Sequence, residues 1–207
     1  MGSEILVYMR LGFEHILGLR GYDHILFVVA LTIPYAVREW RAVLVQVTAF
    51  TVGHSVTLAL ATTRVVRLPT SWVEFLIPVT ILVTALVQIA RARALVPDAA
   101  ADPATEFRSA PLSSPTTWGL AFGFGLVHGL GFSNFLRALL GAEASLLVPL
   151  ASFNVGLELG QLIIVALMLF VATVGLHLGV DRRRRVVAVA SVVAVVSLVL
   201  SILRLPM

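Results

Sequence analysis

Residues 43–62 read VLVQVTAFTVGHSVTLALAT, a run without a single charged side chain and with one histidine, His54, near its middle. A helix of about 20 apolar residues crosses a hydrocarbon layer about 30 Å thick. The stretch therefore predicts a membrane-spanning helix. Because an ionisable side chain inside a membrane usually faces the bundle interior and marks a site, His54 is the first candidate functional residue.

Comparable apolar runs recur along the chain, at 16–37, 72–89, 117–140, 146–172 and 186–203. Of the 207 residues, 59% are hydrophobic and only 13% are charged, a composition that excludes an ordinary soluble domain. We predict an all-α fold, a polytopic membrane bundle of about six transmembrane helices. It forms a single transmembrane domain over residues 1–207.

The polar stretches predict how this domain is divided. Residues 1–15 are expected to form an external N-terminal segment. Residues 93–116 contain several prolines, acidic residues and serines, a composition typical of a flexible linker, here on the cytoplasmic side. The linker separates a first three-helix half, 16–92, from a second, 117–207.

The charges predict the orientation. All 15 basic residues are arginines, and most lie in the gaps after the first, third and fifth predicted spans. Because cytoplasmic loops are enriched in Arg and Lys, both termini are expected outside the cytoplasm. Arginines at span ends do not favour nucleic-acid binding. With no cysteine in the chain, a metal would have to be bound by His, carboxylate or amide groups.

Three histidines of the apolar runs, His24, His54 and His128, share a depth when residues are counted from the nearest span boundary at about 1.5 Å per residue. Asp23 directly precedes His24. Neutral imidazole is the commonest protein ligand of borderline divalent metals, and a carboxylate adds charge or orients a histidine. We therefore predict a divalent transition-metal site formed by His24, His54, His128 and Asp23.

Further polar residues are predicted to form a second shell or a pathway to this site. In the run 146–172, three of them are spaced four and three residues apart and so share one helix face. Two more lie near the predicted outer surface, and one follows His54. The set is Glu158, Asn154, Gln161, Glu74, His15 and Ser55.

A purely structural interpretation stays open for each of these residues. A lone intramembrane histidine can tie two helices together by hydrogen bonds. Ser55 and the threonines around it can bond back to carbonyls of their own helix. The glycines Gly125 and Gly129 flank His128 with GxxxG spacing, which indicates that another helix backbone approaches closely there.

Five stretches resemble the HupE/UreJ group of bacterial membrane proteins, in the expected order. They are GFEHILGLRGYDHILFVVAL (12–31), TAFTVGHSVTLALA (48–61), VEFLIP (73–78), FGLVHGLGFSNFL (124–136) and FNVGLELGQL (153–162). The resemblance implies a multi-pass protein of the bacterial cytoplasmic membrane with a role in nickel or cobalt uptake. It also implies that the family's recurrent polar positions are occupied here by Asp23, His24, His54, His128, Asn154, Glu158 and Gln161.

Two departures separate the chain from the nickel permease pattern. His15 is followed by Ile16 where that pattern has proline, and the Asp-His pair lies further along. The stretch LVQIA (86–90) retains only Gln88 where a carboxylate-amide pair is expected. The chain is therefore more similar to the second branch of the group.

The leading functional prediction is a permease for a divalent transition metal (Ni, Co or Zn), or a metal-handling accessory protein. The alternative is an intramembrane zinc-dependent hydrolase in which three histidines hold zinc and Asp23 or Glu158 acts as base. A third class is an interaction protein whose histidines only pack helices. The expected partners are membrane lipids, the metal ion, and a second copy of the chain or a metalloenzyme-maturation protein, with no nucleic acid.

Overall fold

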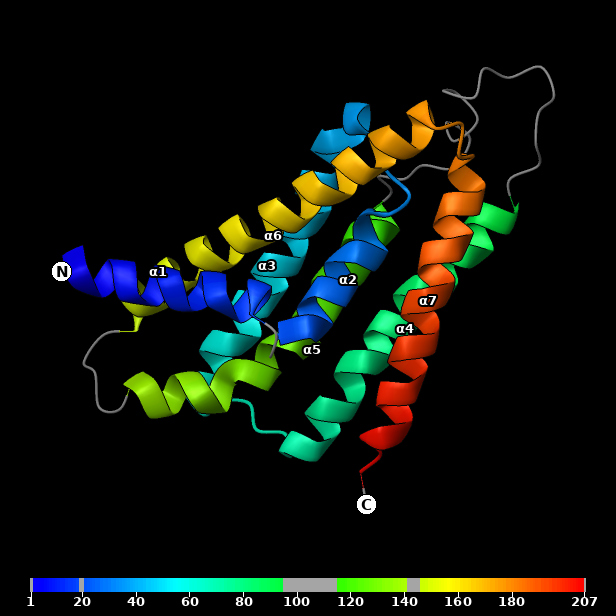
Figure 1. Ribbon diagram of the computed structural model, residues 1–207. Helices are drawn as coiled ribbons and strands as arrows, with labels where there is room; N and C mark the ends of the chain where they lie inside the picture. The colour runs from blue at the N-terminus through cyan, green and yellow to red at the C-terminus, as the bar shows by residue number, and fades with distance from the viewer. Residues whose placement is uncertain (1, 19–20, 95–114, 141–145, 207) are drawn as a thin grey trace.

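The structure, a computed structural model, describes residues 2–18, 21–94, 115–140 and 146–206. Its regular structure within these ranges is entirely helical. The helices are α1 (Gly2–Leu17), α2 (Tyr22–Thr32), α3 (Trp40–Thr62), α4 (Thr70–Ala94), α5 (Pro115–Leu140), α6 (Leu147–His177) and α7 (Arg182–Leu203), with a short 3-10 helix, η2 (Val37–Glu39), before α3 (Figure 1).

Five of these helical stretches are long and apolar enough to cross a membrane: Val37–Thr62, Thr70–Ala94, Thr117–Leu136, Leu147–His177 and Arg182–Leu203. Helix α2 is apolar but has only 11 residues, about 16 Å at the usual rise. The predicted class, an all-α polytopic membrane bundle, is confirmed. The predicted linker, 93–116, lies mostly outside the described residues.

The N-terminal region differs in detail from the predicted external segment and first span, 16–37. Residues 2–17 form a helix of their own, the chain turns sharply before α2, and α2 ends at Thr32. The turn requires glycine at position 21, because a Cβ there would lie 2.0 Å from the backbone oxygen of His15. After α2, Pro34 prevents the helix from continuing. The apolar run is therefore two elements with a corner between them.

Three helix pairs form the most extensive contacts: α3 with α5, α1 with α6, and α4 with α7. Figure 1 shows α1 beside α6 on the left and α4 beside α7 on the right, with α2 between the two groups. The α1–α6 pair is close because both helices place glycine at the contact. A Cβ on Gly12 would lie 2.0 Å from the Phe153 oxygen, and one on Gly156 would lie 1.8 Å from the Met9 oxygen.

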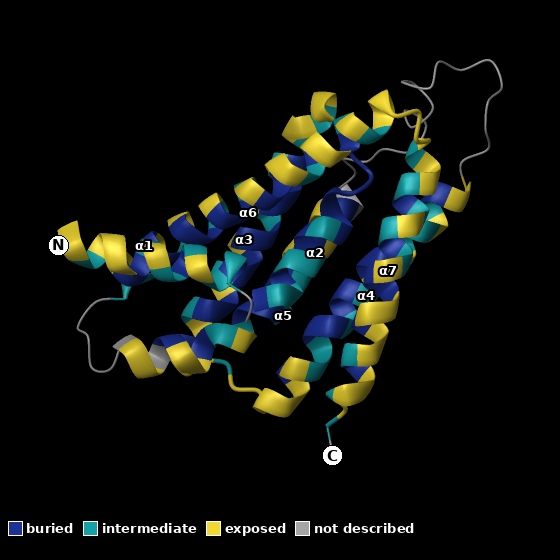
Figure 2. Ribbon diagram, viewed as in Figure 1, coloured by how far each residue is buried: buried dark blue, intermediate teal, exposed yellow. Residues whose placement is uncertain are grey.

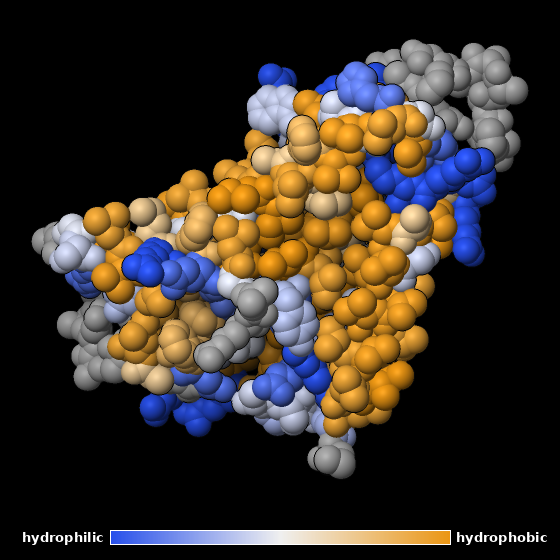
Figure 3. Space-filling model, in the orientation of Figure 1, coloured by the Kyte–Doolittle hydropathy of each residue, from blue (hydrophilic) through white to orange (hydrophobic). Residues whose placement is uncertain are grey.

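Burial follows the same arrangement. The sides of the helices that face one another are buried, whereas their outer faces are exposed (Figure 2). Those outer faces carry large apolar side chains, such as Leu167, Phe170 and Val195, and the visible face of the molecule is largely hydrophobic (Figure 3). An apolar exterior of this extent suits contact with lipid.

Candidate functional site

Four histidines from four helices meet inside the bundle. They are His15 at the end of α1, His24 at the start of α2, His54 of α3 and His128 of α5. The ring centroid of His24 lies 4.5 Å from that of His15, 5.7 Å from that of His54 and 5.0 Å from that of His128. The side chains of His54 and His128 are completely buried. We call these four side chains the histidine cluster.

Two members of the cluster are oriented by neighbouring polar groups. Nδ1 of His24 lies 3.0 Å from Oδ1 of Asp23, and Nε2 of His128 lies 2.9 Å from the hydroxyl oxygen of Thr80 in α4. In each pair the second ring nitrogen stays available. A carboxylate or hydroxyl that holds one imidazole nitrogen and leaves the other for a ligand is the usual arrangement around metal-binding histidines.

Several nitrogens of the cluster have no hydrogen-bond partner in the described part of the chain, although they are buried. They are Nε2 of His15, Nε2 of His24, both ring nitrogens of His54 and Nδ1 of His128. Burial of a polar atom without a partner costs about 1–3 kcal/mol. These buried nitrogens are the atoms of the cluster that a ligand or a water molecule could satisfy.

Glycines allow α3 and α5, the helices that carry His54 and His128, to approach each other closely. A Cβ on Gly125 would lie 2.2 Å from the Phe50 oxygen, and one on Gly129 would lie 2.2 Å from the His54 oxygen. The backbones of α3 and α5 are therefore nearly in contact on both sides of His128. The close approach predicted from the GxxxG spacing is confirmed.

A layer of phenylalanines covers one side of the cluster. Phe27, Phe50 and Phe124 each lie one helical turn from His24, His54 and His128, toward the end of the bundle that carries Arg38, Arg91 and Arg182. The Phe27 and Phe50 rings are stacked at 4.6 Å, and the Phe124 ring meets Phe27 edge-on at 6.2 Å. We call these three rings the aromatic floor. It separates the cluster from the arginine-rich end.

The other side of the cluster is also bordered by aromatic rings. His15 lies 4.1 Å from Phe132 of α5 and 5.7 Å from Phe153 of α6, measured between ring centroids, and these two phenylalanines stack on each other at 5.0 Å. The histidines are therefore enclosed between two aromatic contacts.

The predicted polar face of α6 lies against α3. Glu158 accepts a hydrogen bond of 2.6 Å from Thr48, and Gln161 accepts one of 2.8 Å from Thr51, three residues before His54. The side-chain oxygen of Asn154 is buried without a partner in the described residues. Ser55, by contrast, donates to the Thr51 carbonyl of its own helix, as the structural interpretation expected.

Glu74 lies apart from the histidines. It is exposed near the start of α4, where it lines a surface cavity of about 270 Å³ together with Arg67, Thr70, Ser133 and Asn134. Ser133 and Asn134 are five and six residues beyond His128 on α5, so the cavity lies about 8 Å beyond the cluster along that helix. This position suits the predicted outer location of Glu74.

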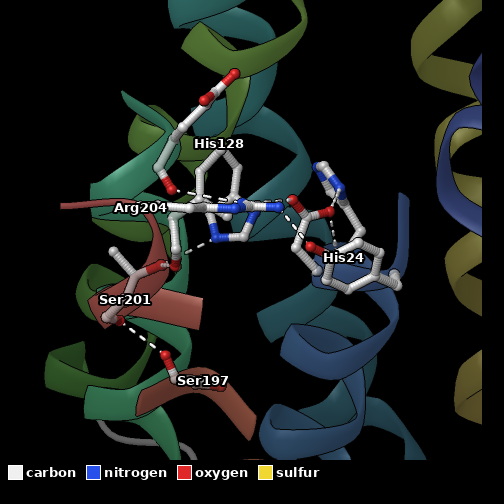
Figure 4. A network of polar contacts seen from close by, with 10 residues as sticks. His24, His128, Ser197, Ser201 and Arg204 are labelled. Atoms are coloured by element: carbon white, nitrogen blue, oxygen red, sulfur yellow. Dashed lines mark hydrogen bonds and ion pairs between the residues drawn. The ribbon is translucent and has the colours of Figure 1, made fainter. Parts of the chain in front are cut away.

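Sequence reasoning missed two residues that contact the site. Thr80 is one of several threonines in an apolar run, and nothing in the sequence distinguishes it from threonines that bond only to their own helix. Arg204, just after α7, was used only as a topology signal. Figure 4 shows its guanidinium reaching toward the start of α2, beside His24.

The donor set suits a borderline divalent metal, since it combines buried imidazoles with one carboxylate. Within the described residues, no group of three or more His, Asp and Glu side chains is placed so that it could hold a metal ion as the side chains stand. The roles of His24, His54, His128 and Asp23 as ligands therefore stay predictions, whereas their gathering in one place is a feature of the structure.

Fold and site together define a multi-pass helical membrane protein with a histidine cluster buried between its helices. Over residues 1–204 the chain matches the protein family described as HupE / UreJ protein, and it belongs to that family. Membership implies a membrane protein concerned with nickel or cobalt handling. Comparison with curated proteins and with solved structures gives no match.

Proposed function

We propose that the chain is a permease for a divalent transition-metal cation of the nickel or cobalt type, acting in the cytoplasmic membrane of a bacterium. The ion is bound by His24, His54 and His128 and by Asp23. The observation that carries the proposal is the convergence of histidines from separate helices with buried, unsatisfied ring nitrogens. Neutral imidazole offers such an ion a lone pair that the surrounding apolar side chains do not.

The aromatic rings on both sides of the histidine cluster support a role as a carrier. A carrier must hold its ion out of contact with both sides at one stage of its cycle. Here the stacked Phe132 and Phe153 border the cluster near His15, and the aromatic floor separates it from the arginine-rich end. Access from outside then runs by way of the cavity beside Glu74. Release toward the cytoplasm requires the rings of Phe27 and Phe50 to part.

The polar contacts between α3 and α6 suit a role in that release. Thr48, Thr51, Glu158 and Gln161 form hydrogen bonds across the helix interface on the arginine-rich side of His54. Oxygen ligands bind such metals more weakly than imidazole does. An ion that leaves the histidines can therefore be received here without being trapped.

Uptake by proteoliposomes tests the proposal. Purified protein is reconstituted with a nickel-sensitive dye inside the vesicles, and nickel is added outside. We expect wild-type protein to admit nickel, His54→Ala to abolish uptake, and His177→Ala, a change at an exposed residue at the end of α6, to leave it intact. Unchanged uptake in a folded His54→Ala protein contradicts the proposal. Zinc that stays bound through purification, together with hydrolysis of an amide or ester lipid, favours the enzyme instead.

A further inference from the structure

Arg204 connects three helices at the Glu74 end of the bundle. It caps α7, and its guanidinium donates hydrogen bonds to the Tyr22 hydroxyl of α2 and, at 3.4 Å, to the backbone oxygen of Glu74 in α4. The guanidinium carbon also lies 5.7 Å from the centroid of the Tyr22 ring. These contacts hold the cation beside the first turn of α2, next to the histidine cluster (Figure 4).

Asp23 lies between this cation and the cluster. Its Oδ1 accepts the backbone N–H of His24 at 2.9 Å and meets Nδ1 of the same residue, while Oδ2 lies 4.0 Å from Nη1 of Arg204. The Asp23 side chain is only 13% exposed, so solvent screens its charge weakly. The Asp23 carboxylate thus interacts with two groups at once. One is the His24 imidazole, which can bind a metal, and the other is the Arg204 guanidinium, which stays tethered to the end of α7.

We propose that Arg204 is the internal counter-ion of Asp23 in the ion-free protein and that the transported cation displaces it. This inference rests on the proposed function. A divalent ion at His24 and the guanidinium of Arg204 repel each other and compete for the same carboxylate charge. When the ion binds, Arg204 leaves Asp23 while keeping its bond to Tyr22 or to the Glu74 carbonyl. When the ion departs, Arg204 returns and prevents immediate rebinding.

This makes Arg204 a positioning residue that sets the affinity of the site. A counter-ion of this kind weakens binding in exchange for faster release, since the bound ion is always opposed by a nearby positive charge. A residue that merely braced Asp23 would act in the opposite direction, because removing it would disorder the carboxylate and weaken metal binding. The sign of the change in affinity separates the two roles.

Calorimetric titration of purified protein with nickel measures whether the change in affinity is an increase or a decrease. Arg204→Gln is expected to bind nickel about tenfold more tightly than wild type, within the usual range of coupling between two sites. Arg204→Lys, which keeps the charge, is expected to bind as wild type does. In an Asp23→Asn background, Arg204→Gln is expected to have a smaller effect, because the competition for the carboxylate is gone and only the direct repulsion between ion and guanidinium remains.

Thermal unfolding gives a second, independent readout. Arg204→Gln is expected to lower the melting temperature of metal-free protein more than that of nickel-saturated protein, because only the former uses the Asp23–Arg204 pair. Unchanged or weaker nickel binding in Arg204→Gln, or an effect of the same size with Asp23→Asn, overturns the inference. If wild-type protein binds no nickel, cobalt or zinc, the proposed function falls as well; wild-type binding that His54→Ala abolishes shows that only the role of Arg204 has failed.

A separate cavity at the opposite end carries a second inference. It has a volume of about 640 Å³ and lies between the end of α6, the start of α7 and η2. Its walls combine apolar side chains, among them Val37, Leu176 and Val180, with three arginines, Arg38, Arg182 and Arg185. Among the described residues that line it, Asp181 is the one carboxylate, and nearby Glu39 is already paired with Arg182 at 2.6 Å.

We infer that this cavity binds an anionic phospholipid. The guanidinium charges exceed the carboxylates around them, and Nε of Arg185 is buried without a partner in the described residues, while Nη1 of the same side chain donates to the Ala172 carbonyl at 2.7 Å. A phosphate group supplies the missing charge, and basic pockets between helices at the cytoplasmic side are a recognised site for anionic headgroups. The volume and the apolar walls leave room for the start of the acyl chains, which a free phosphate would not fill.

Native mass spectrometry of protein from mixed vesicles of phosphatidylglycerol and phosphatidylcholine tests this site. We expect selective retention of phosphatidylglycerol, a several-fold loss in Arg185→Gln and in Arg38→Gln, and no loss in Arg67→Gln, an arginine at the other end. Arg38 is exposed, so its variant retains the fold even if Arg185→Gln does not. Equal retention of both lipids overturns the inference. Retention of added inorganic phosphate that matches the retention of phosphatidylglycerol overturns it as well.

Discussion

At the scale of single residues, His24, His54 and His128 are held differently, and this decides which of their ring nitrogens lack a partner. Asp23 contacts Nδ1 of His24 and Thr80 contacts Nε2 of His128, whereas both nitrogens of His54 lack partners in the described residues. Two rings are therefore fixed by their neighbours, while His54 is held only by packing. His54 is the member most available to a ligand.

Asp23→Asn tests how much the carboxylate contributes. Asparagine preserves the size and a hydrogen bond to His24 but removes the negative charge. Loss of a group that orients a ligand typically costs about 10–100-fold in metal affinity, and we expect a drop in that range by nickel titration. Asp181→Asn is the matched control, because asparagine also caps a helix well. Equal affinities of wild type and Asp23→Asn would show that Asp23 does not support the site.

Residues of the site could be predicted from the sequence where a polar side chain lies in an apolar run, because burying such a group costs free energy. His24, His54 and His128 stand out because an ionisable group in an apolar run is expensive, and counting residues predicted their shared depth. Thr80 and Arg204 could not be recognised in this way. A threonine in a helix has a hydrogen-bond partner in its own backbone, and an arginine at a span end is expected anyway, so neither needs a tertiary contact to account for it.

At the scale of helices, contacts between glycines and backbone position the site. The α3–α5 pair approaches closely at Gly53, Gly125 and Gly129, and this brings His54 and His128 within reach of His24. The GxxxG spacing indicated a close approach but not the partner, which depends on how the whole chain folds. The break between α1 and α2 was not predicted, because the predicted apolar run continues across it; only the glycines Gly18 and Gly21 carry that signal.

Gly129→Ala tests the close approach. The added Cβ would lie 2.2 Å from the His54 backbone oxygen and 2.3 Å from the Thr57 hydroxyl, so the helices must separate. Overpacking of this kind typically costs about 1–3 kcal/mol, and we expect a matching fall in the free energy of unfolding together with weaker metal binding. Gly123→Ala on the same helix meets nothing within 4 Å and is expected to be neutral or slightly stabilising. Similar stability of the two variants would contradict the packing described.

Phe50→Leu tests the aromatic floor. Leucine retains apolar bulk but loses the stacking on Phe27, so the barrier between the cluster and the arginine-rich end becomes incomplete. We expect vesicles containing this variant to lose trapped nickel faster than wild-type vesicles at equal protein content. Phe170→Leu, a change on the exposed outer face of α6, serves as control. Equal leak rates in wild type and Phe50→Leu would exclude a gating role for this ring.

At the scale of the molecule, the fold surrounds a small polar centre with apolar helices whose outer faces suit lipid. The membrane class followed from composition and run length alone. The pairing of α1 with α6, and with it the position of His15 beside His24, did not follow. Predicting that His15 joins the cluster required knowing that α1 is a separate helix, which its polar residues concealed.

X-ray absorption at the nickel edge of nickel-loaded protein tests the central claim most directly. We predict a first shell with the scattering signature of several imidazole rings, which His54→Ala and His128→Ala each reduce while His177→Ala leaves it unchanged. A shell of oxygen ligands only, or a spectrum that neither cluster variant alters, would contradict the claim that the buried histidines bind the ion.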